Sequence, residues 1–254
     1  MRFEYPWIKK ELSCDGVGCH RGDILPLARK TQEWLSIHGL GVMVDGEFGP
    51  ATEAALKVFQ EKNSLPADGV VNVETFTALT APLLRVLTFL PAASNLGQMV
   101  IGYATQHLAE YPREVGGQNR GPWVRLYMEG NEGKEWAWCA GFACFILRQA
   151  AETLLTALPV KPTFSCDELA ARARSAGIFL SGFHLSDPTN QLTPGSIFLN
   201  RKSQTDWNHT GIVTAVYKET FETIEGNTND AGEREGYEVC RRSRSYDKKD
   251  FIVI

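Results

Sequence analysis

The sequence lacks the features that would place it in a specialised class of protein. It has no apolar run of about 18 residues, the length that a membrane-spanning helix needs, so we predict no membrane span. The net charge is −4, so the protein has no general basic character and we expect no nucleic acid partner. Six cysteines in 254 residues are too few for a disulfide-rich scaffold. These absences leave an ordinary globular protein of one large domain or two medium-sized ones.

The N-terminal segment MRFEYPWIKKELSC also lacks two parts of a secretory signal peptide. It has neither an apolar central region nor a small-residue cleavage site. We therefore expect the protein to be made in the cytoplasm without a cleavable signal. If it acts in the periplasm or cell wall, phage lysis or a secretion route other than the ordinary one must deliver it.

The spacing of the cysteines does not favour a metal site, and we predict no metal and no other cofactor. Cys14, Cys19 and the adjacent His20 could form a small disulfide or a weak metal corner. A zinc site usually needs four ligands, and no second Cys/His pair lies nearby. A bridge between Cys166 and Cys240 is a further possibility that the sequence leaves open.

Periodic apolar residues predict three helices in the first third of the chain. The first begins at Pro26, the second follows Gly49, and the third begins near Val73. Two similar loops precede the second and third helices: DGEFGPAT at 45–52 and DGVVNVET at 68–75. In both loops Asp-Gly makes a tight turn, in which glycine supplies the positive φ. The pattern predicts a small three-helix unit with two matching loop-to-helix entries.

This run of residues resembles the type 1 peptidoglycan-binding module. The resemblance covers about a fifth of the chain and rests on Gln32, Leu35, DGEFGPAT, Phe59-Gln60, Leu65, DGVV and Thr75. It implies that the unit binds cell-wall peptide stems or glycan in a shallow groove, with Asp45 and Asp68 as substrate contacts. For most of these residues, including Phe59 and Leu35, a role in the helical core is the simpler explanation.

We expect four segments along the chain and an α+β fold. Residues 1–22 look irregular and form an N-terminal extension, and 23–82 form the three-helix domain. Residues 83–95 are apolar, unlike a flexible linker, so we interpret them as a packed connector. In 96–254 we expect helices over 96–111, 138–154 and 166–176, packed on an antiparallel sheet made of GSIFLN, HTGIVTAVY, FETIEGN, YEVCRRS and FIVI.

A histidine and a carboxylate lie on two neighbouring strands of this sheet. His209 begins HTGIVTAVY, and Glu225 and Asn227 end FETIEGN. Alternate residues of a strand share a face, so an odd number of connecting residues places His209 opposite Asn227 with all three side chains on one face. An even number would turn one strand over. The carboxylate would then fix the imidazole tautomer and leave the other ring nitrogen free to take a thiol proton.

A cysteine at the predicted start of a helix completes the set. Cys139 lies in WAWCAGF, where first-turn N–H groups and the helix dipole favour a thiolate. Cys144 lies further along the same helix, and we assign it to the core. Taken singly, each of these residues is more often structural than catalytic; the order cysteine, histidine, carboxylate-x-amide is what favours a catalytic site.

That order resembles the CHAP superfamily of cysteine- and histidine-dependent amidohydrolases and peptidases, which have a papain-like fold. The resemblance rests on WCAGF, GSIF at 195–198, HTGIV at 209–213 and IEGN at 224–227. It implies Cys139 as nucleophile, His209 as general base, Glu225 as orienting acid and Asn227 as an auxiliary polar group. The loop at 114–122 resembles the entry of related wall hydrolases, with Glu114 and Asn119 as weaker candidates for substrate contact, together with Trp138. The aspartate-rich calcium loop of some relatives is missing, so we predict no calcium.

The sequence thus predicts a peptidoglycan hydrolase that cleaves an amide bond through a cysteine thioester, as an endopeptidase or an N-acetylmuramoyl-L-alanine amidase. A phage endolysin and an antibacterial effector both fit. We expect a monomer whose partner is bacterial peptidoglycan, with a holin, a secretion machine or an immunity protein as further partners. The alternatives are a non-catalytic wall-binding protein with a degenerate papain-like domain, and a protease or transglutaminase that acts on protein.

Overall fold

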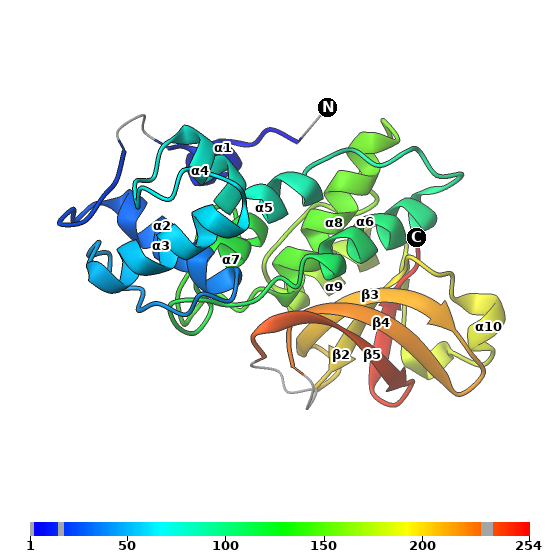
Figure 1. Cartoon of the computed structure of the whole chain (residues 1–254). Coiled ribbons are helices and arrows are strands. Elements are labelled where there is room, and N and C mark those ends of the chain that lie inside the picture. The colour runs from blue at the N-terminus through cyan, green and yellow to red at the C-terminus, as the bar shows by residue number, and fades with distance from the viewer. Residues whose placement is uncertain (1–2, 15–17, 230–235) are drawn as a thin grey trace. The chain divides into compact units, whose positions relative to one another are not determined.

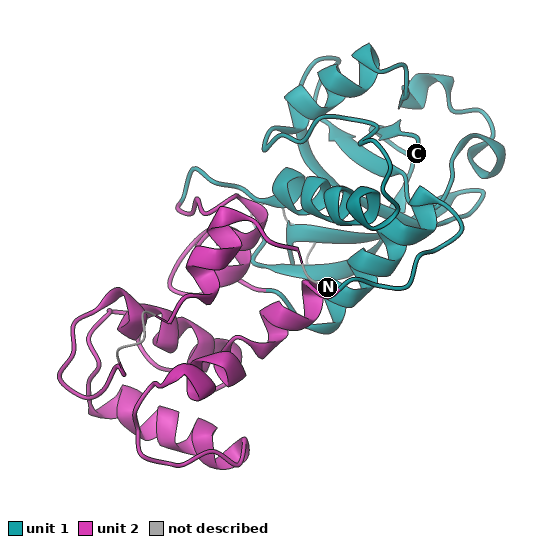
Figure 2. Cartoon of the chain, turned by 90° about the horizontal axis from the view of Figure 1, so that it is seen from above, with its two compact units in different colours: residues 1, 89–112, 134–254 teal, residues 2–88, 113–133 magenta. Residues whose placement is uncertain are grey.

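The chain folds into two compact units. The computed structural model describes residues 3–14, 18–229 and 236–254. Residues 2–88 and 113–133 form one unit, here called the helical unit, and residues 89–112 and 134–254 form the other, the sheet unit (Figure 2). We expected the first domain to end near residue 82; the contacts instead divide the chain after Thr88 and group residues 113–133 with the first unit.

The helical unit contains the three helices that the sequence predicts (Figure 1). These are α2 (Pro26–Ile37), α3 (Pro50–Lys62) and α4 (Val73–Leu79). Proline at the first position of α2 and α3 suits helix entry because its missing N–H would have no partner there. Three further helices were not predicted: α1 (Pro6–Leu12), α5 (Ala81–Val86) and α7 (Pro122–Tyr127). The expectation that residues 1–22 are irregular is therefore wrong for α1.

The two Asp-Gly loops have matching hydrogen bonds. In each, the side-chain amide of a buried glutamine donates to the aspartate and accepts from the backbone N–H of the following glycine. It also donates to a threonine hydroxyl in the next helix. The distances are 2.7, 2.8 and 3.1 Å for Gln32 with Asp45, Gly46 and Thr52, and 2.8, 2.9 and 3.3 Å for Gln60 with Asp68, Gly69 and Thr75.

Arg125 of α7 lies in an ionic cluster inside the helical unit. Its guanidinium contacts Glu11 of α1 at 2.8 Å, Glu33 of α2 at 2.6 Å and Glu132 at 2.8 Å. Arg29 also pairs with Glu33 and Glu132. The cluster connects three helices of the unit, two of which the sequence analysis missed.

In the sheet unit, helices pack on an antiparallel sheet. The strands are β1 (Phe179–Leu180), β2 (Ile197–Arg201), β3 (Trp207–Val216), β4 (Thr220–Thr228), β5 (Glu238–Ser245) and β6 (Lys249–Ile252), in the order β1-β6-β2-β3-β4-β5. Helix α8 (Cys139–Thr153) packs on β3 and β4, α6 (Leu96–Ala109) packs on α8, and α9 (Cys166–Ser175) packs on β3. Short η1 (Gly182–His184) and α10 (Pro188–Gln191) precede β2. The α+β class is confirmed.

A bulge in the β3–β4 hairpin decides which side chains share a face. At the turn, Val216 pairs with Phe221, so four residues connect the paired positions. That even number would turn His209 away from Glu225. A register shift between Val213 and Ala215 adds one residue, and Ile212 then pairs with Ile224. This register turns His209 and Glu225 to the same face, in agreement with the 2.8 Å contact between their side chains.

A core of apolar side chains supports the far end of this hairpin. Phe198 of β2, Val213 of β3 and Phe221 of β4 are buried there together with Leu192 and Phe251. Among the residues that the structure describes, no helix is long and apolar enough to cross a bilayer.

Candidate active site

Cys139 is the first residue of α8, as the sequence predicts. Trp138 occupies the position before the helix and makes no side-chain cap, and no acidic residue lies in the first turn. The N–H groups of that turn and the positive end of the helix dipole favour a negative charge at this position. The residue is 5% exposed.

His209 and Glu225 are in hydrogen-bond contact. The Nε2 atom of His209 lies 2.8 Å from Oε2 of Glu225, and both side chains are buried. Because Nε2 is engaged by the carboxylate, Nδ1 is the ring nitrogen left for the thiol. Nδ1 is buried and makes no hydrogen bond of ordinary geometry to a described residue.

Two further side chains hold the carboxylate of Glu225. Arg244 of β5 donates through Nε to Oε1 at 2.8 Å and through a terminal nitrogen to Oε2 at 2.6 Å. The hydroxyl of Thr223 donates to Oε1 at 2.5 Å. Glu225 is 0% exposed, so these contacts take the place of water and fix the orientation of the carboxylate.

The surroundings keep Glu225 negative and His209 positive. Burial alone would raise the pKa of Glu225, but the hydrogen bonds and charges of Arg244 and His209 outweigh it and lower the pKa to about 2. Burial would lower the pKa of His209, but Cys139 and Glu225 together raise it to about 9. At neutral pH the ring is therefore an imidazolium.

The Cys139 thiol has a pKa that is shifted downward, opposite to that of His209. Its pKa is lowered well below the usual value, first by the hydrogen bond from Cys166 and then, against the effect of burial, by His209 and the backbone N–H of Thr210. The sulfur atoms of Cys139 and Cys166 lie 3.8 Å apart. A thiolate at Cys139 beside an imidazolium at His209 is the pairing that activates a cysteine nucleophile.

Comparison with protein families supports both sequence resemblances. Residues 26–79 match the family model described as a putative peptidoglycan binding domain, and residues 129–227 match the CHAP domain. The chain combines a peptidoglycan-binding module with a CHAP domain. No curated protein and no solved structure matches it significantly.

Asn227 and Trp138 lie beside the CHAP domain's cysteine and histidine but are buried. Asn227 follows Glu225 on β4 with a φ of 55° and is 1% exposed. Trp138 is 0% exposed, and a Cβ on Gly226 would approach its ring to 2.7 Å. The ring thus packs against the strand between Glu225 and Asn227. These contacts support a packing role for Trp138, and its substrate contact remains a prediction.

The four other predicted substrate contacts lie in the helical unit. Asp45 and Asp68 of the peptidoglycan-binding module each accept one hydrogen bond from a backbone N–H of their own loop and one from a glutamine of the preceding helix. Glu114 accepts from the backbone N–H of Asn119 at 2.8 Å and closes the loop at 114–119. Each of these carboxylates thus has a local structural partner, and their contact with substrate stays a prediction.

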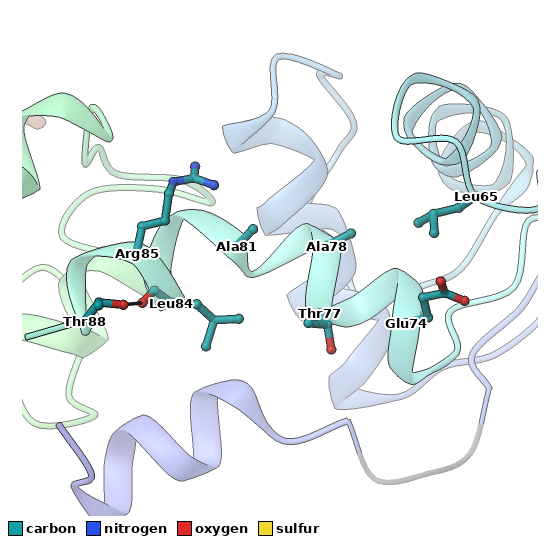
Figure 3. A pocket seen from close by; sticks show the side chains of 8 residues that line it. All are labelled: Leu65, Glu74, Thr77, Ala78, Ala81, Leu84, Arg85 and Thr88. Carbon is teal, nitrogen blue, oxygen red and sulfur yellow. Dashed lines mark hydrogen bonds between the residues drawn. The ribbon is translucent and has the colours of Figure 1, made fainter. Parts of the chain in front are cut away.

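The helical unit also contains a pocket along α4 and α5, partly within and partly beyond the residues that match the peptidoglycan-binding module (Figure 3). Most of its lining is apolar or small, with Glu74 toward one end and Arg85 toward the other. The complete lining is Leu65, Glu74, Thr77, Ala78, Ala81, Leu84, Arg85 and Thr88. Within the described residues, no group of three or more His, Cys, Asp and Glu side chains is suited to a metal ion.

Sequence analysis missed three contributors to the CHAP site. Thr223 and Arg244 hold Glu225, and Cys166 contacts Cys139. The spacing Thr-x-Glu on β4 could have indicated Thr223, since residues two apart share a face. Arg244 and Cys166 gave no comparable signal, because both reach the site through tertiary packing.

Proposed function

We propose that this protein hydrolyses an amide bond of the bacterial cell-wall peptide through a thioester on Cys139. The observation that carries the proposal is the connected set of side chains: Cys139 beside His209, and His209 bonded to Glu225 at 2.8 Å. The match to the CHAP domain supports the reaction class, and the peptidoglycan-binding module supports the substrate.

The first half of the reaction uses the thiolate and the imidazolium. The sulfur of Cys139 attacks the amide carbonyl carbon, and the backbone N–H of Cys139 at the start of α8 donates to the developing oxyanion. The Nδ1 proton of His209 passes to the leaving amine, which departs as the thioester forms.

The second half regenerates the enzyme. The now neutral Nδ1 of His209 takes a proton from water, and the resulting hydroxide attacks the thioester carbonyl. The carbon–sulfur bond then breaks, which releases the carboxylic acid product and restores the thiolate of Cys139 beside the imidazolium. Glu225 holds the Nε2–H throughout, so the ring keeps the orientation and tautomer that both steps need. Arg244 acts through Glu225, and it is a positioning residue rather than a catalytic one.

The peptidoglycan-binding module would hold the enzyme on its insoluble substrate. The pocket along α4 and α5 is apolar with a carboxylate and a guanidinium near its ends, which suits a short peptide with small apolar side chains and charged termini. Thr77→Trp, which fills this pocket, should weaken binding to purified wall. The control is Val58→Trp, at a partly exposed apolar position of α3. Equal binding by both variants would remove the pocket from the proposal.

Either an endolysin or an antibacterial effector would use this chemistry. The scissile bond is that of an endopeptidase, within the stem or cross-bridge peptide, or of an amidase, between muramic acid and L-alanine. Both reactions use the same thiolate and the same proton donor. Mass spectrometry of fragments from defined muropeptides separates them, because only the amidase frees the amine of L-alanine.

Substitution of the nucleophile tests the central claim. Cys139→Ala should reduce the release of soluble fragments from purified wall at least about 1,000-fold, since no other group supplies the covalent step. The matched control is Cys144→Ala, which removes a buried thiol from the same helix. If Cys139→Ala keeps the wild-type rate, Cys139 is not the nucleophile. If the wild type binds wall but releases nothing, the protein is a wall-binding protein with a degenerate papain-like domain.

A further inference from the structure

A second thiol lies directly beside the proposed nucleophile. Cys139 and Cys166 occupy the first positions of α8 and α9, and their sulfur atoms are 3.8 Å apart. Both thiols are free, and both are nine-tenths or more buried. The sheet unit therefore brings together two cysteines that are 27 residues apart in the sequence.

The two thiols differ in protonation in the way that a reactive and a resolving cysteine differ. The pKa of Cys139 is lowered well below the ordinary value, while that of Cys166 is raised well above it, first by its hydrogen bond to Cys139 and then by burial. Cys139 is therefore the thiolate that would attack an oxidant, and Cys166 is the thiol held next to it. Loss of the negative charge when Cys139 is oxidised removes the main cause that keeps Cys166 protonated.

We propose that Cys139 and Cys166 form a reversible disulfide that switches the site off when a peroxide reaches it. The effect on activity rests on the proposed function, whereas formation of the bond does not. In the first step the thiolate of Cys139 takes one oxygen from the peroxide, which breaks its O–O bond; with hydrogen peroxide, the hydroxide released takes a proton to become water. In the second step the sulfur of Cys166 displaces hydroxide from the sulfenic acid of Cys139. The sulfur–sulfur bond forms, and the proton of Cys166 leaves with the hydroxide as a second water.

The geometry requires only a small movement. A disulfide bond is about 2.05 Å long, so the two sulfur atoms must approach each other by a little under about 2 Å. Rotation of the two side chains supplies motion of this size. Cys144, the other thiol of α8, is less well prepared, because burial raises its pKa to about 11 and leaves it protonated.

The bond would protect the nucleophile as well as block it. A lone cysteine sulfenic acid is oxidised further to sulfinic acid, which common thiol reductants do not reverse. A disulfide with Cys166 stops the oxidation one step earlier and returns to two thiols when a reductant is present. For a hydrolase that acts outside a reducing compartment, such a reversible disulfide would prevent permanent loss of the nucleophile.

Peptide mapping without reduction tests the bond directly. The protein is treated with hydrogen peroxide, its remaining thiols are alkylated, and it is digested with trypsin. The structure predicts a linked pair of peptides, 135–148 and 149–172, with fragmentation that places the bond at Cys139 rather than at Cys144. In Cys166→Ser the linked pair should be missing and the sulfinic acid of Cys139 should accumulate; Cys144→Ser is the matched control and should still form the linked pair.

Recovery of activity tests the consequence. The oxidised wild type should lose at least about ten-fold in wall hydrolysis and regain it with dithiothreitol, whereas oxidised Cys166→Ser should stay at least about five-fold below its own untreated rate. A linkage through Cys144, or sulfinic acid formation that is as fast in the wild type as in Cys166→Ser, would overturn the proposal. The mapping reads the bond whether or not the protein cleaves wall, so failure of the switch and failure of the proposed function give different results.

Discussion

Each unit contains a partly buried arginine that is paired with buried carboxylates, and only one of the two arginines lies next to reactive groups. Arg125 in the helical unit contacts three carboxylates, those of Glu11, Glu33 and Glu132. Arg244 in the sheet unit contacts one carboxylate, that of Glu225, and that carboxylate also binds His209. Both guanidiniums make a two-point contact with a carboxylate. The partners of Arg125 are all carboxylates, whereas the set that begins at Arg244 continues through Glu225 to an imidazole and a thiol.

The buried carboxylates of the two clusters, Glu33 and Glu225, have pKa values shifted in opposite directions. Burial raises the pKa of Glu33 above its usual range, and Arg125 and Arg29 only partly offset this because the neighbouring Glu11 opposes them. For Glu225 the hydrogen bonds and charges of Arg244 and His209 outweigh burial, and its pKa falls to about 2. A buried ionic network is therefore not by itself a sign of a catalytic site. The distinguishing feature is a titratable ring that has one nitrogen held and the other free.

Removal of Arg125 should have the largest effect on stability. Arg125→Met leaves Glu33, which is 0% exposed, without its main counter-ion, and we expect a loss of about 3–5 kcal/mol in the free energy of unfolding of the helical unit. Hydrolysis of a soluble peptide substrate by the folded protein should change little, because Arg125 contacts none of the proposed catalytic residues. Denaturant unfolding and initial rates measure the two effects.

The control for Arg125 is another arginine of the same segment. Arg120 is 43% exposed and lies 3.9 Å from Glu132, so Arg120→Met should lower the free energy of unfolding by no more than about 0.5 kcal/mol. Similar losses for both variants would show that the Arg125 cluster is as weak as an exposed ion pair, and the contrast between the two arginines would fail.

Removal of Arg244 should have a smaller effect on stability and a distinct effect on its pH dependence. Arg244→Met leaves the buried carboxylate of Glu225 without its arginine partner, and we expect the free energy of unfolding to fall by about 2–3 kcal/mol. The loss should be smaller than for Arg125→Met because the guanidinium of Arg244 is partly exposed. The folded-state pKa of Glu225 lies below its unfolded value, so its stabilisation is present above about pH 4.5 and is lost as the pH falls toward 2. Without Arg244 the folded-state pKa of Glu225 should rise toward its unfolded value, so the acid-dependent loss should be smaller and should be complete at higher pH, which unfolding between pH 2 and 7 would detect.

Arg244→Lys separates charge from geometry. Lysine keeps the positive charge but cannot make the two-point contact with Glu225, so it should restore part of the stability and little of the orientation of His209. We expect a lower kcat with an unchanged KM. Full activity in Arg244→Lys would mean that the charge alone is sufficient.

Glu225→Gln should move the alkaline limit of activity. The pKa of His209 is raised to about 9 with the help of Glu225, so the imidazolium and the stability it contributes persist at neutral pH and are lost as the pH rises through 9. Glutamine keeps a polar partner but removes the charge. The alkaline limb of the pH–rate profile should therefore move from near pH 9 to lower pH by about one unit, which corresponds to about 1.4 kcal/mol. Glu222→Gln, at an exposed position of the same strand, should leave the limb in place.

The helix start and the strands that carry the site were predictable from the sequence, whereas the strand register and the long-range contacts of the site were not. Cys139 at a helix start and the β3–β4 hairpin follow from helix and strand periodicity. The register does not, because the bulge at Thr214 is invisible in a pattern of apolar residues and yet decides whether His209 faces Glu225. Arg244 reaches Glu225 across the β4–β5 ladder, where Cys240 rather than Arg244 is the paired residue.

The division of the chain shows the same limit. Residues 113–133 follow the first helix of the sheet unit in sequence, and we expected them to belong to it. Their contacts lie in the helical unit because Arg125 reaches α1 and α2, and Arg113 donates to carbonyls at the end of α2. Only a folded structure reveals such partners, since each pair is more than 70 residues apart.

The smallest expected effect concerns the two Asp-Gly loops of the peptidoglycan-binding module. The side-chain oxygen of Asp45 accepts from Gln32 and from the backbone of Glu47, and asparagine can accept both bonds. If the carboxylate serves to close the loop, as these contacts support, Asp45→Asn and its counterpart Asp68→Asn should change binding to purified wall less than about two-fold. Gln32→Ala removes the partner of the loop and should lower the melting temperature more than either. A loss of wall binding above about ten-fold in Asp45→Asn, at an unchanged melting temperature, would instead make the carboxylate the substrate contact that the sequence predicts.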